Sequence, residues 1–333
     1  MKKTLIASAI AAATFSGAVA AQESNLPTVY GNIQYAITHT NVDGSGSNIK
    51  HFDNGSTLGV KHDHEIAPGI KGFLKLEMEG LNADDKDAEG DNAGLNELDE
   101  AYIGIEGDSF GKVWVGSDDS TYESAIDKIV NFHEVGSDIG GSYETGEGDL
   151  VQYQTPSFGG LKLGAAVQVN GDGDDATLSD KSNEKSYPYQ LAATYSVDAL
   201  ELAVAMDSND GAGGANNENT YGLRGTYSMG DFSLTGEYQT RKDVADEYGV
   251  IGVYTMGANQ FALSYQINDN DVTGDKNDTV ILQALHNLSD NMYVYFEGYL
   301  SGADGAEYYD DPDGVAAGGD EKSIAAVGAV YYF

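Results

Sequence analysis

Apolar and polar residues alternate at every second position in many short stretches of this chain. In residues 29–38, Val29 and Ile33 fall on one face, whereas Asn32 and Gln34 fall on the other. A period of two is typical of β-strands, because their successive side chains point to opposite sides. The same alternation recurs in residues 69–79, 160–170, 232–240 and 259–267. Sustained helical periodicity is hard to find, so the pattern predicts an all-β protein.

The connections between these stretches alternate in length. Short connections are predicted at residues 65–69, 107–111, 157–160, 196–199, 228–231, 255–260 and 288–291. Long, mostly acidic connections are predicted at residues 39–55, 80–98, 117–148, 170–186, 207–219, 240–247, 268–278 and 300–321. Strict alternation indicates antiparallel up-and-down hairpins with every short turn at one end. The count gives about sixteen strands, and no shift in composition divides them into separate domains.

The first residues of the chain are typical of a secretory signal peptide. A basic start precedes an apolar run from Thr4 to Phe15, and small residues near Ala20 form a cleavage site. A membrane anchor is the alternative, but the apolar run is short for one. We therefore expect residues 1–21 to be removed and residues 22–333 to form one exported domain. The chain has no cysteine, so disulfide bonds do not hold that domain.

A soluble β-sandwich and an outer-membrane barrel both show alternating strands. An export signal, strands of about ten residues and an even strand count favour a barrel whose apolar face meets lipid. Aromatic residues also gather where strands meet short turns, as in the aromatic belts of membrane proteins. These residues are Tyr195, Tyr227, Phe232, Tyr254, Phe261 and Tyr293. We therefore predict that residues 22–333 form an antiparallel transmembrane β-barrel of about sixteen strands.

The charge of the chain is strongly negative. Asp and Glu number 54 against 17 Lys and Arg, which gives a formal net charge of -37. Such a surface repels phosphates and attracts cations, which argues against nucleic-acid binding. We expect the acidic loops to hold divalent cations loosely, and these ions to bridge the loops to lipopolysaccharide phosphates. Solvation in a salty habitat is an alternative, compatible role for this charge.

Five stretches, taken in order, resemble the general diffusion porins of Gram-negative bacteria. Residues 56–77 are similar to the second hairpin of these porins, which reads S-R-L-G-F-K-G-x-E-x-L-G-x-G-L-K-A-x-F-Q-x-E. Residues 101–117 and 149–168 are similar to A-Y-V-G-L-x-G-x-F-G-x-V-x-x-G-R and N-S-V-x-Y-x-S-P-x-F-x-G-L. Residues 285–299 and 327–333 are similar to Y-x-L-S-K-R-T-x-x-Y and V-G-L-R-H-R-F. The resemblance covers essentially the whole mature chain.

This resemblance implies a homotrimer of sixteen-stranded barrels that form water-filled channels in the outer membrane. It also implies that the loop after the fifth strand, residues 117–148, folds inward and narrows the pore. Independently of the resemblance, this loop is long, acidic and compatible with a helix near residues 121–132. In the family, the outer-membrane barrel assembly machinery reads an aromatic final strand, which assigns that role to Tyr331 and Phe333.

The inward loop keeps its acids, whereas the wall has lost arginines that the family carries. The predicted acidic constriction residues are Asp118, Asp119, Glu123, Asp127, Glu134 and Asp138. Thr57 and Ser117 occupy family arginine positions, and Val330 and Tyr332 occupy basic positions of the last motif. The predicted pore-wall residues are Thr57, Lys61, Lys71, Lys75, Lys162 and Arg224. Because the acids remain while these arginines are lost, we predict a cation-selective channel.

Two motifs resemble parts of metal-binding sites, but each lacks ligands that a complete site needs. His62 and His64 share a strand face near a short turn, but two ligands are too few for zinc. Residues 170–181 are similar to a calcium loop, but Asp175 and Lys181 stand where that loop needs Gly and Glu. No metal and no cofactor is therefore predicted.

Two other function classes compete with general diffusion. Catalysis is disfavoured, because none of the six histidines lies in a recognisable nucleophile motif and the chain lacks cysteine. A sugar-specific channel is the closer alternative, since such channels line one wall with aromatic residues. Its candidates are Tyr122, Tyr143, Tyr153, Tyr293 and Tyr295, although their spacing shows no continuous path.

Overall fold

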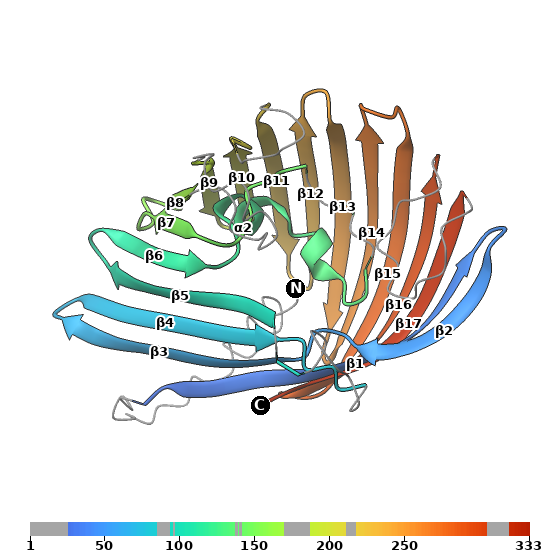
Figure 1. The fold of residues 1–333 in the computed structure, drawn as a ribbon, viewed down its shortest axis with the longest axis horizontal. Coiled ribbons are helices and arrows are strands. Elements are labelled where there is room, and N and C mark those ends of the chain that lie inside the picture. Colours follow the sequence, from blue (N-terminus) through green and yellow to red (C-terminus); the bar gives the residue numbers. More distant parts are fainter. Residues whose placement is uncertain are drawn as a thin grey trace, which may run out of the picture.

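The fold is a single antiparallel sheet that closes on itself (Figure 1). The computed structural model describes residues 26–84, 94–95, 97–136, 139, 142–169, 187–210, 218–304 and 320–333. The predicted signal peptide and the calcium-like stretch 170–181 lie outside these residues. Within the described part of the chain, no helix is long and apolar enough to cross a membrane.

The elements follow one another in simple order. The first strands are β1 (Thr28–Val42), β2 (Gly46–Asp53), β3 (Thr57–Ala67), β4 (Ile70–Glu79), β5 (Glu97–Gly107) and β6 (Gly111–Ser117). The helices α2 (Thr121–Ile126) and η2 (Val130–Phe132) come next. The remaining strands are β7 (Leu150–Gln154), β8 (Leu161–Gln168), β9 (Tyr189–Val197), β10 (Leu200–Asp207), β11 (Thr220–Met229), β12 (Phe232–Arg241), β13 (Ala245–Met256), β14 (Asn259–Asn270), β15 (Lys276–Ser289), β16 (Met292–Ala303) and β17 (Glu321–Tyr332).

The barrel has sixteen strands, although the sheet contains 17 segments. Both β2 and β3 pair with β1, so they form one strand that is interrupted at residues 54–56. The Asp53 carboxylate accepts hydrogen bonds from the backbone N–H groups of Gly55 and Ser56, at 3.0 and 2.7 Å. Gly55 has a φ of 95°, a conformation that favours glycine. This local turn bends the strand without ending it.

The two faces of the barrel wall differ as the alternation predicts. On β4, Leu74 and Leu76 are 38% and 42% exposed on the outer face, whereas Glu77 is fully buried on the inner face. Apolar residues point outward and polar residues point inward, which is the arrangement of a membrane barrel rather than of a soluble sandwich. The prediction of a closed sixteen-stranded antiparallel barrel is therefore confirmed.

Three of the predicted loops are shorter than the sequence suggests. β1 and β2 pair out to Val42 and Gly46, so their turn is only residues 43–45 instead of 39–55. Likewise, the turns between β12 and β13 and between β14 and β15 are only residues 242–244 and 271–275. The strand ends there are polar on both faces, because the strands continue beyond the apolar band into water. Backbone hydrogen bonds hold such ends, so polarity alone does not mark a loop.

The predicted aromatic belt is only partly right. Four of its members are between 40% and 47% exposed on the outer face: Tyr195, Tyr227, Tyr254 and Phe261. Tyr293 instead is buried on the inner face, where its hydroxyl donates to the Glu134 carboxylate at 2.9 Å. Its strand, β16, turns this position inward, so a place near a short turn does not by itself put an aromatic side chain in the membrane interface.

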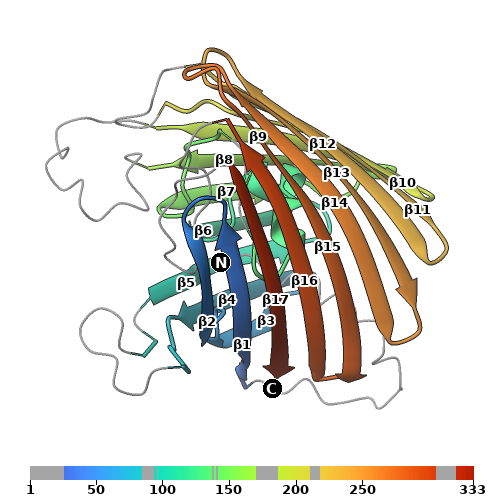
Figure 2. The ribbon, with the colours of Figure 1, turned by 90° about the vertical axis from the view of Figure 1, so that its right-hand side faces the viewer.

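The last strand closes the barrel against the first one, as Figure 2 shows. The Phe333 N–H donates to the Gly31 carbonyl at 3.1 Å, and the Gly31 N–H donates to the Phe333 carbonyl at 3.2 Å. A Cβ at Gly31 would lie 2.7 Å from the Phe333 ring, so the glycine leaves room for that ring. The terminal residue is therefore part of the sheet.

Deleting Phe333 should lower the yield of assembled barrel. The deletion removes two backbone hydrogen bonds from the closing seam, worth together about 1–3 kcal/mol, and also the proposed assembly signal. The measurement is the heat-modifiable fraction in outer membranes on gels. Phe333→Tyr keeps both the ring and the backbone pair and should assemble normally, whereas an undiminished yield after deletion would contradict the role of this residue.

Candidate pore constriction

Residues 118–149 connect β6 to β7, and the described residues among them lie inside the barrel (Figure 1). α2 lies against β8, β9, β10 and β11, and its side chains Tyr122 and Ile126 are fully buried. Ser120 begins the helix, because its hydroxyl accepts the N–H of Glu123 at 3.2 Å. Gly222 on the wall makes room, since a Cβ there would lie 2.6 Å from the Tyr122 hydroxyl. The prediction of an inward-folded loop is thus confirmed.

Two wall carboxylates hold the backbone of this loop. Glu237 of β12 accepts the N–H groups of Lys128 and Ile129 at 2.8 and 3.1 Å. Glu297 of β16 accepts those of Glu134 and Val135, both at 2.8 Å. A side-chain carboxyl group has two oxygens with acceptor sites for several donors. Each acid therefore fixes two successive residues of the loop.

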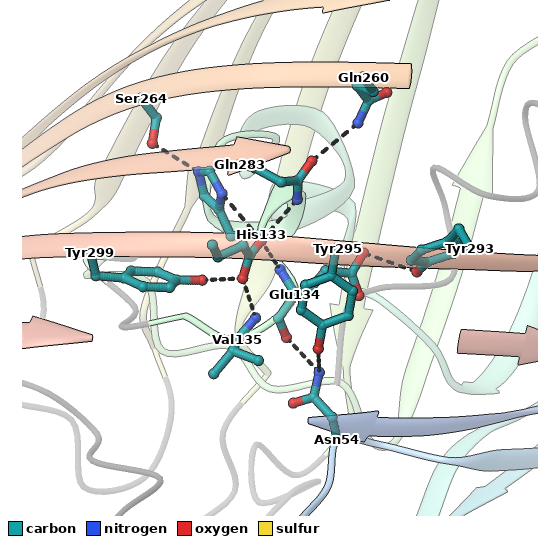
Figure 3. A network of polar contacts seen from close by, with 11 residues as sticks. Asn54, His133, Glu134, Val135, Gln260, Ser264, Gln283, Tyr293, Tyr295 and Tyr299 are labelled. Atoms are coloured by element: carbon teal, nitrogen blue, oxygen red, sulfur yellow. Dashed lines mark hydrogen bonds and ion pairs between the residues drawn. The ribbon is translucent and has the colours of Figure 1, made fainter. Parts of the chain in front are cut away.

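Figure 3 shows the polar network around the second of these anchors. Glu297 is completely buried, and it also accepts hydrogen bonds from the Gln283 amide at 2.8 Å and from the Tyr299 hydroxyl. The His133 Nε2 atom lies 2.8 Å from the Ser264 hydroxyl, and its Nδ1 atom lies 3.7 Å from Glu297 Oε1. Strands β14 and β16 thus contact the tip of the loop directly, and β15 supports the Glu297 carboxylate through Gln283.

The tip of the loop also contacts the N-terminal part of the barrel, between β2 and β3. The Asn54 amide donates to the Glu134 carbonyl at 2.9 Å and to the Tyr295 hydroxyl at 3.2 Å. Asn54 belongs to the interruption between β2 and β3. The bend in that strand therefore brings the Asn54 side chain to the tip of the loop. Through Asn54, the first strands of the barrel contact both the loop and β16.

The remaining lumen contains a cavity of about 1240 Å³ with charges of both signs on its wall. The lining bases are Lys61, Lys75, Lys112, Lys128, Lys162 and Arg224. The lining acids are Glu100, Asp118, Asp119, Glu134, Glu201 and Asp290. Arg224 pairs with Glu201 at 2.7 Å, and Lys75 pairs with Glu100. Among the described residues, the cavity lining is therefore balanced in formal charge.

The residues predicted from the sequence lie in several different places. Of the loop acids, Asp118, Asp119 and Glu134 line the cavity, whereas Glu123 and Asp127 are buried between loop and wall. Asp138 lies outside the described residues. Of the wall residues, the cavity lining includes Lys61, Lys75, Lys162 and Arg224. Thr57 is buried against Asn32. Lys71 is exposed at the start of β4, next to the turn between β3 and β4.

Sequence reasoning missed two lining bases, Lys112 and Lys128, and the wall acids that anchor the loop. Lys112 is two residues before Trp114 on β6, so both side chains share one face of the strand. This alternation could have placed Lys112 in the lumen. Lys128 belongs to the loop, where no periodicity tells which side chains face the lumen. The anchoring role of Glu237 and Glu297 depends on where the loop lies, which no local pattern indicates.

Asp118 has an altered acidity at the start of the loop. Burial raises the pKa of Asp118 to about 6, and the nearby Glu100 carboxylate adds to the rise. The Lys112 ammonium and a 2.7 Å hydrogen bond from the Trp114 indole N–H oppose it. For Lys128, burial first and the Arg224 guanidinium second lower the pKa. Burial is the main cause of both pKa shifts, and the neighbouring charges modify them.

A closed barrel with an apolar outer face and a loop folded into a polar lumen defines a channel protein of the outer membrane. The chain matches the Gram-negative porin family model over residues 7–306, and it belongs to that family.

Relatives cover almost the whole chain. A monosaccharide porin of a Halomonas species is 30% identical and is matched over 96% of this chain and 99% of its own. Outer membrane porin protein 32 of Delftia acidovorans is 26% identical, over 98% of this chain and 97% of its own. Both matches include the strands and the loop.

Solved structures share the fold. The anion-selective porin from Comamonas acidovorans has a TM-score of 0.75 and 19% identity, over 92% of this chain and 99% of its own. Salmonella typhi OmpF in complex with daunomycin has a TM-score of 0.70 and 16% identity, over 93% of this chain and 98% of its own. At these identities the likeness is one of architecture.

Glu297→Ala should release the tip of the loop from the wall. The change leaves the N–H groups of Glu134 and Val135 without their acceptor, at a cost of about 1–3 kcal/mol for each buried donor. We expect faster protease cleavage within the loop of the folded channel and a lower midpoint of urea unfolding. Tyr299→Phe removes only one donor to the same carboxylate and should change both readouts far less. Equal behaviour of the two variants would contradict the anchoring role.

Proposed function

We propose that this porin passes ions and small hydrophilic solutes by diffusion and prefers cations. The observation that carries the proposal is the loop held across a polar lumen in a chain with a formal net charge of -37. A cavity of about 1240 Å³ remains beside the loop, and the excess of acidic residues in the chain attracts cations toward it.

The balanced cavity lining refines the origin of this preference. Acids and bases are equal in number around the described cavity, so the constriction alone supplies little net charge. The excess of acids over the whole chain therefore acts mainly at the mouths of the pore, where it enriches cations. Charges in water act only within a Debye length, which is about 30 Å at 0.01 M salt and about 3 Å at 1 M. The preference should accordingly depend on salt.

The reversal potential across a planar bilayer in a potassium chloride gradient tests this proposal. We expect cation preference that is strong in dilute salt and weakens toward molar salt. It should also weaken as the pH falls through about 6, because Asp118 then becomes protonated. Asp118→Asn should have a smaller preference and lose that pH step. Anion preference, or no preference at low salt, would refute cation selectivity and leave solvation as the role of the acidic charge.

A sugar channel is the second candidate, and two observations favour it. One relative is named a monosaccharide porin. Several aromatic residues line the cavity, namely Tyr30, Tyr102, Trp114, Phe132, Tyr153, Tyr293, Tyr332 and Phe333. Of the tyrosines predicted for a sugar path, Tyr153 and Tyr293 lie on this lining, whereas Tyr122 and Tyr295 are buried among the loop contacts.

Current block by sugars separates the two candidates. A sugar channel should show saturable block by glucose or short maltodextrins, because aromatic rings would retain the sugar in the pore. A general diffusion channel should show only the small current loss that follows from added viscosity. Sucrose of equal viscosity serves as the control, and current that falls equally with every sugar would argue against a sugar site.

The wider assembly belongs to the same proposal. We propose a homotrimer that is exported by the signal peptide 1–21 and inserted through recognition of Tyr331 and Phe333 by the barrel assembly machinery. Divalent cations at the acidic loops would bridge the protein to lipopolysaccharide. The exposed position of Phe333 and its pairing with Gly31 support a role of the final strand in assembly.

A further inference from the structure

Three aromatic side chains surround the ammonium group of Lys112 in the lumen. The Lys112 Nζ atom lies 4.2 Å from the ring centre of Trp114, 4.9 Å from that of Phe73 and 5.3 Å from that of Tyr102. These residues come from the neighbouring strands β4, β5 and β6, and we call the three rings the aromatic cage. Distances below about 6 Å correspond to favourable cation–π contacts.

The cage is built into the wall rather than formed by chance. Gly104 lies between Phe73 and Trp114 in the strand register, and a Cβ there would lie 2.3 Å from the Phe73 ring and 2.7 Å from the Trp114 Cβ. A Cβ would also lie 2.4 Å from the Val113 carbonyl oxygen, so only glycine leaves room here for the Phe73 ring and for the neighbouring strand. The hydrogen bond from the Trp114 indole N–H to the Asp118 carboxylate fixes the orientation of the Trp114 ring.

Lys112 lies in the cage although a carboxylate is close by. Glu106 stands directly opposite Lys112 on β5, yet in the described part of the chain no carboxylate oxygen lies within 4 Å of this ammonium. The rings, and not an ion pair, therefore hold the charge. A lysine ammonium is strongly hydrated, so it loses more solvation in such a site than a methylated ammonium does.

We propose that the aromatic cage binds quaternary ammonium solutes and that Lys112 is its tethered competitor. Lys112, Tyr102 and Trp114 all line the cavity, so the cage opens to the pore. Glu100 and Asp118 line the same part of the wall and attract cations toward it. When the solute enters, the Lys112 side chain turns toward Glu106. This inference rests on the proposed passage of cations and names one class of them.

Trp114 is the only tryptophan of the chain, so its fluorescence reports on the cage directly. The purified channel is titrated with tetramethylammonium chloride, and sodium chloride of equal ionic strength serves as the background. We expect a weak saturable change in the natural protein. In Lys112→Gln the half-saturating concentration should fall by about tenfold, because the tethered cation no longer competes.

Two variants test whether the effect belongs to the cage. Lys162→Gln removes another cavity-lining lysine, on β8, and should behave like the natural protein. Adding Phe73→Leu to Lys112→Gln should weaken binding again, because it removes one ring of the cage and leaves the backbone of the neighbouring strands unchanged. If Lys112→Gln folds poorly, as seen by heat modifiability, Lys112→Met replaces it in the same comparison.

The outcomes separate this inference from the proposed function. Absence of a saturable change in both Lys112 variants, or equal tightening in Lys162→Gln, would overturn the cage as a binding site. Cation selectivity is measured independently by the reversal potential. A channel without cation preference that still binds tetramethylammonium through the cage would refute only the proposed selectivity.

Discussion

The attachment of the inward loop to buried wall carboxylates is the constraint on which the pore depends. A loop that crosses the lumen takes its backbone N–H groups away from strand partners, and buried donors need acceptors. Glu237 and Glu297 supply them at two points, and each accepts two consecutive N–H groups. The shape of the remaining cavity follows from where these two anchors stand on the wall.

This requirement also explains why the interior of the protein is polar. In a soluble domain the buried residues are mainly apolar, whereas the fully buried side chains of this barrel include Gln152, Gln190 and Gln283. Their amides bind the loop or neighbouring side chains, as Gln152 does with Thr121 at 2.7 Å. The apolar residues face outward, where lipid replaces the core. Packing between loop and wall therefore relies on hydrogen bonds with only small apolar clusters, such as that of Tyr122 and Ile126.

The charges of the chain have two distinct uses. Some acids act as internal acceptors, as Glu297 does, and do not face the pore. Others line the cavity together with an equal number of bases, several of which rest on aromatic rings, as Lys61 does on Tyr30 at 5.1 Å. A net charge read from composition therefore describes the exterior of this protein better than its constriction.

The amino-acid sequence alone was enough to predict the barrel, because strand parity and the outward apolar face follow from a period of two within each stretch. It also placed Phe333 in the closing strand and residues 117–148 in an inward loop, the latter through resemblance to the porins. The ends of several strands could not be predicted, since polar residues in water continue a strand as readily as they form a turn. The folded structure was needed to show that Tyr293 faces inward, that Glu237 and Glu297 hold the loop, and that Lys112 lies among three rings. Those contacts join residues that are far apart in the sequence, and they depend on the register of neighbouring strands or on the path of the loop inside the closed wall.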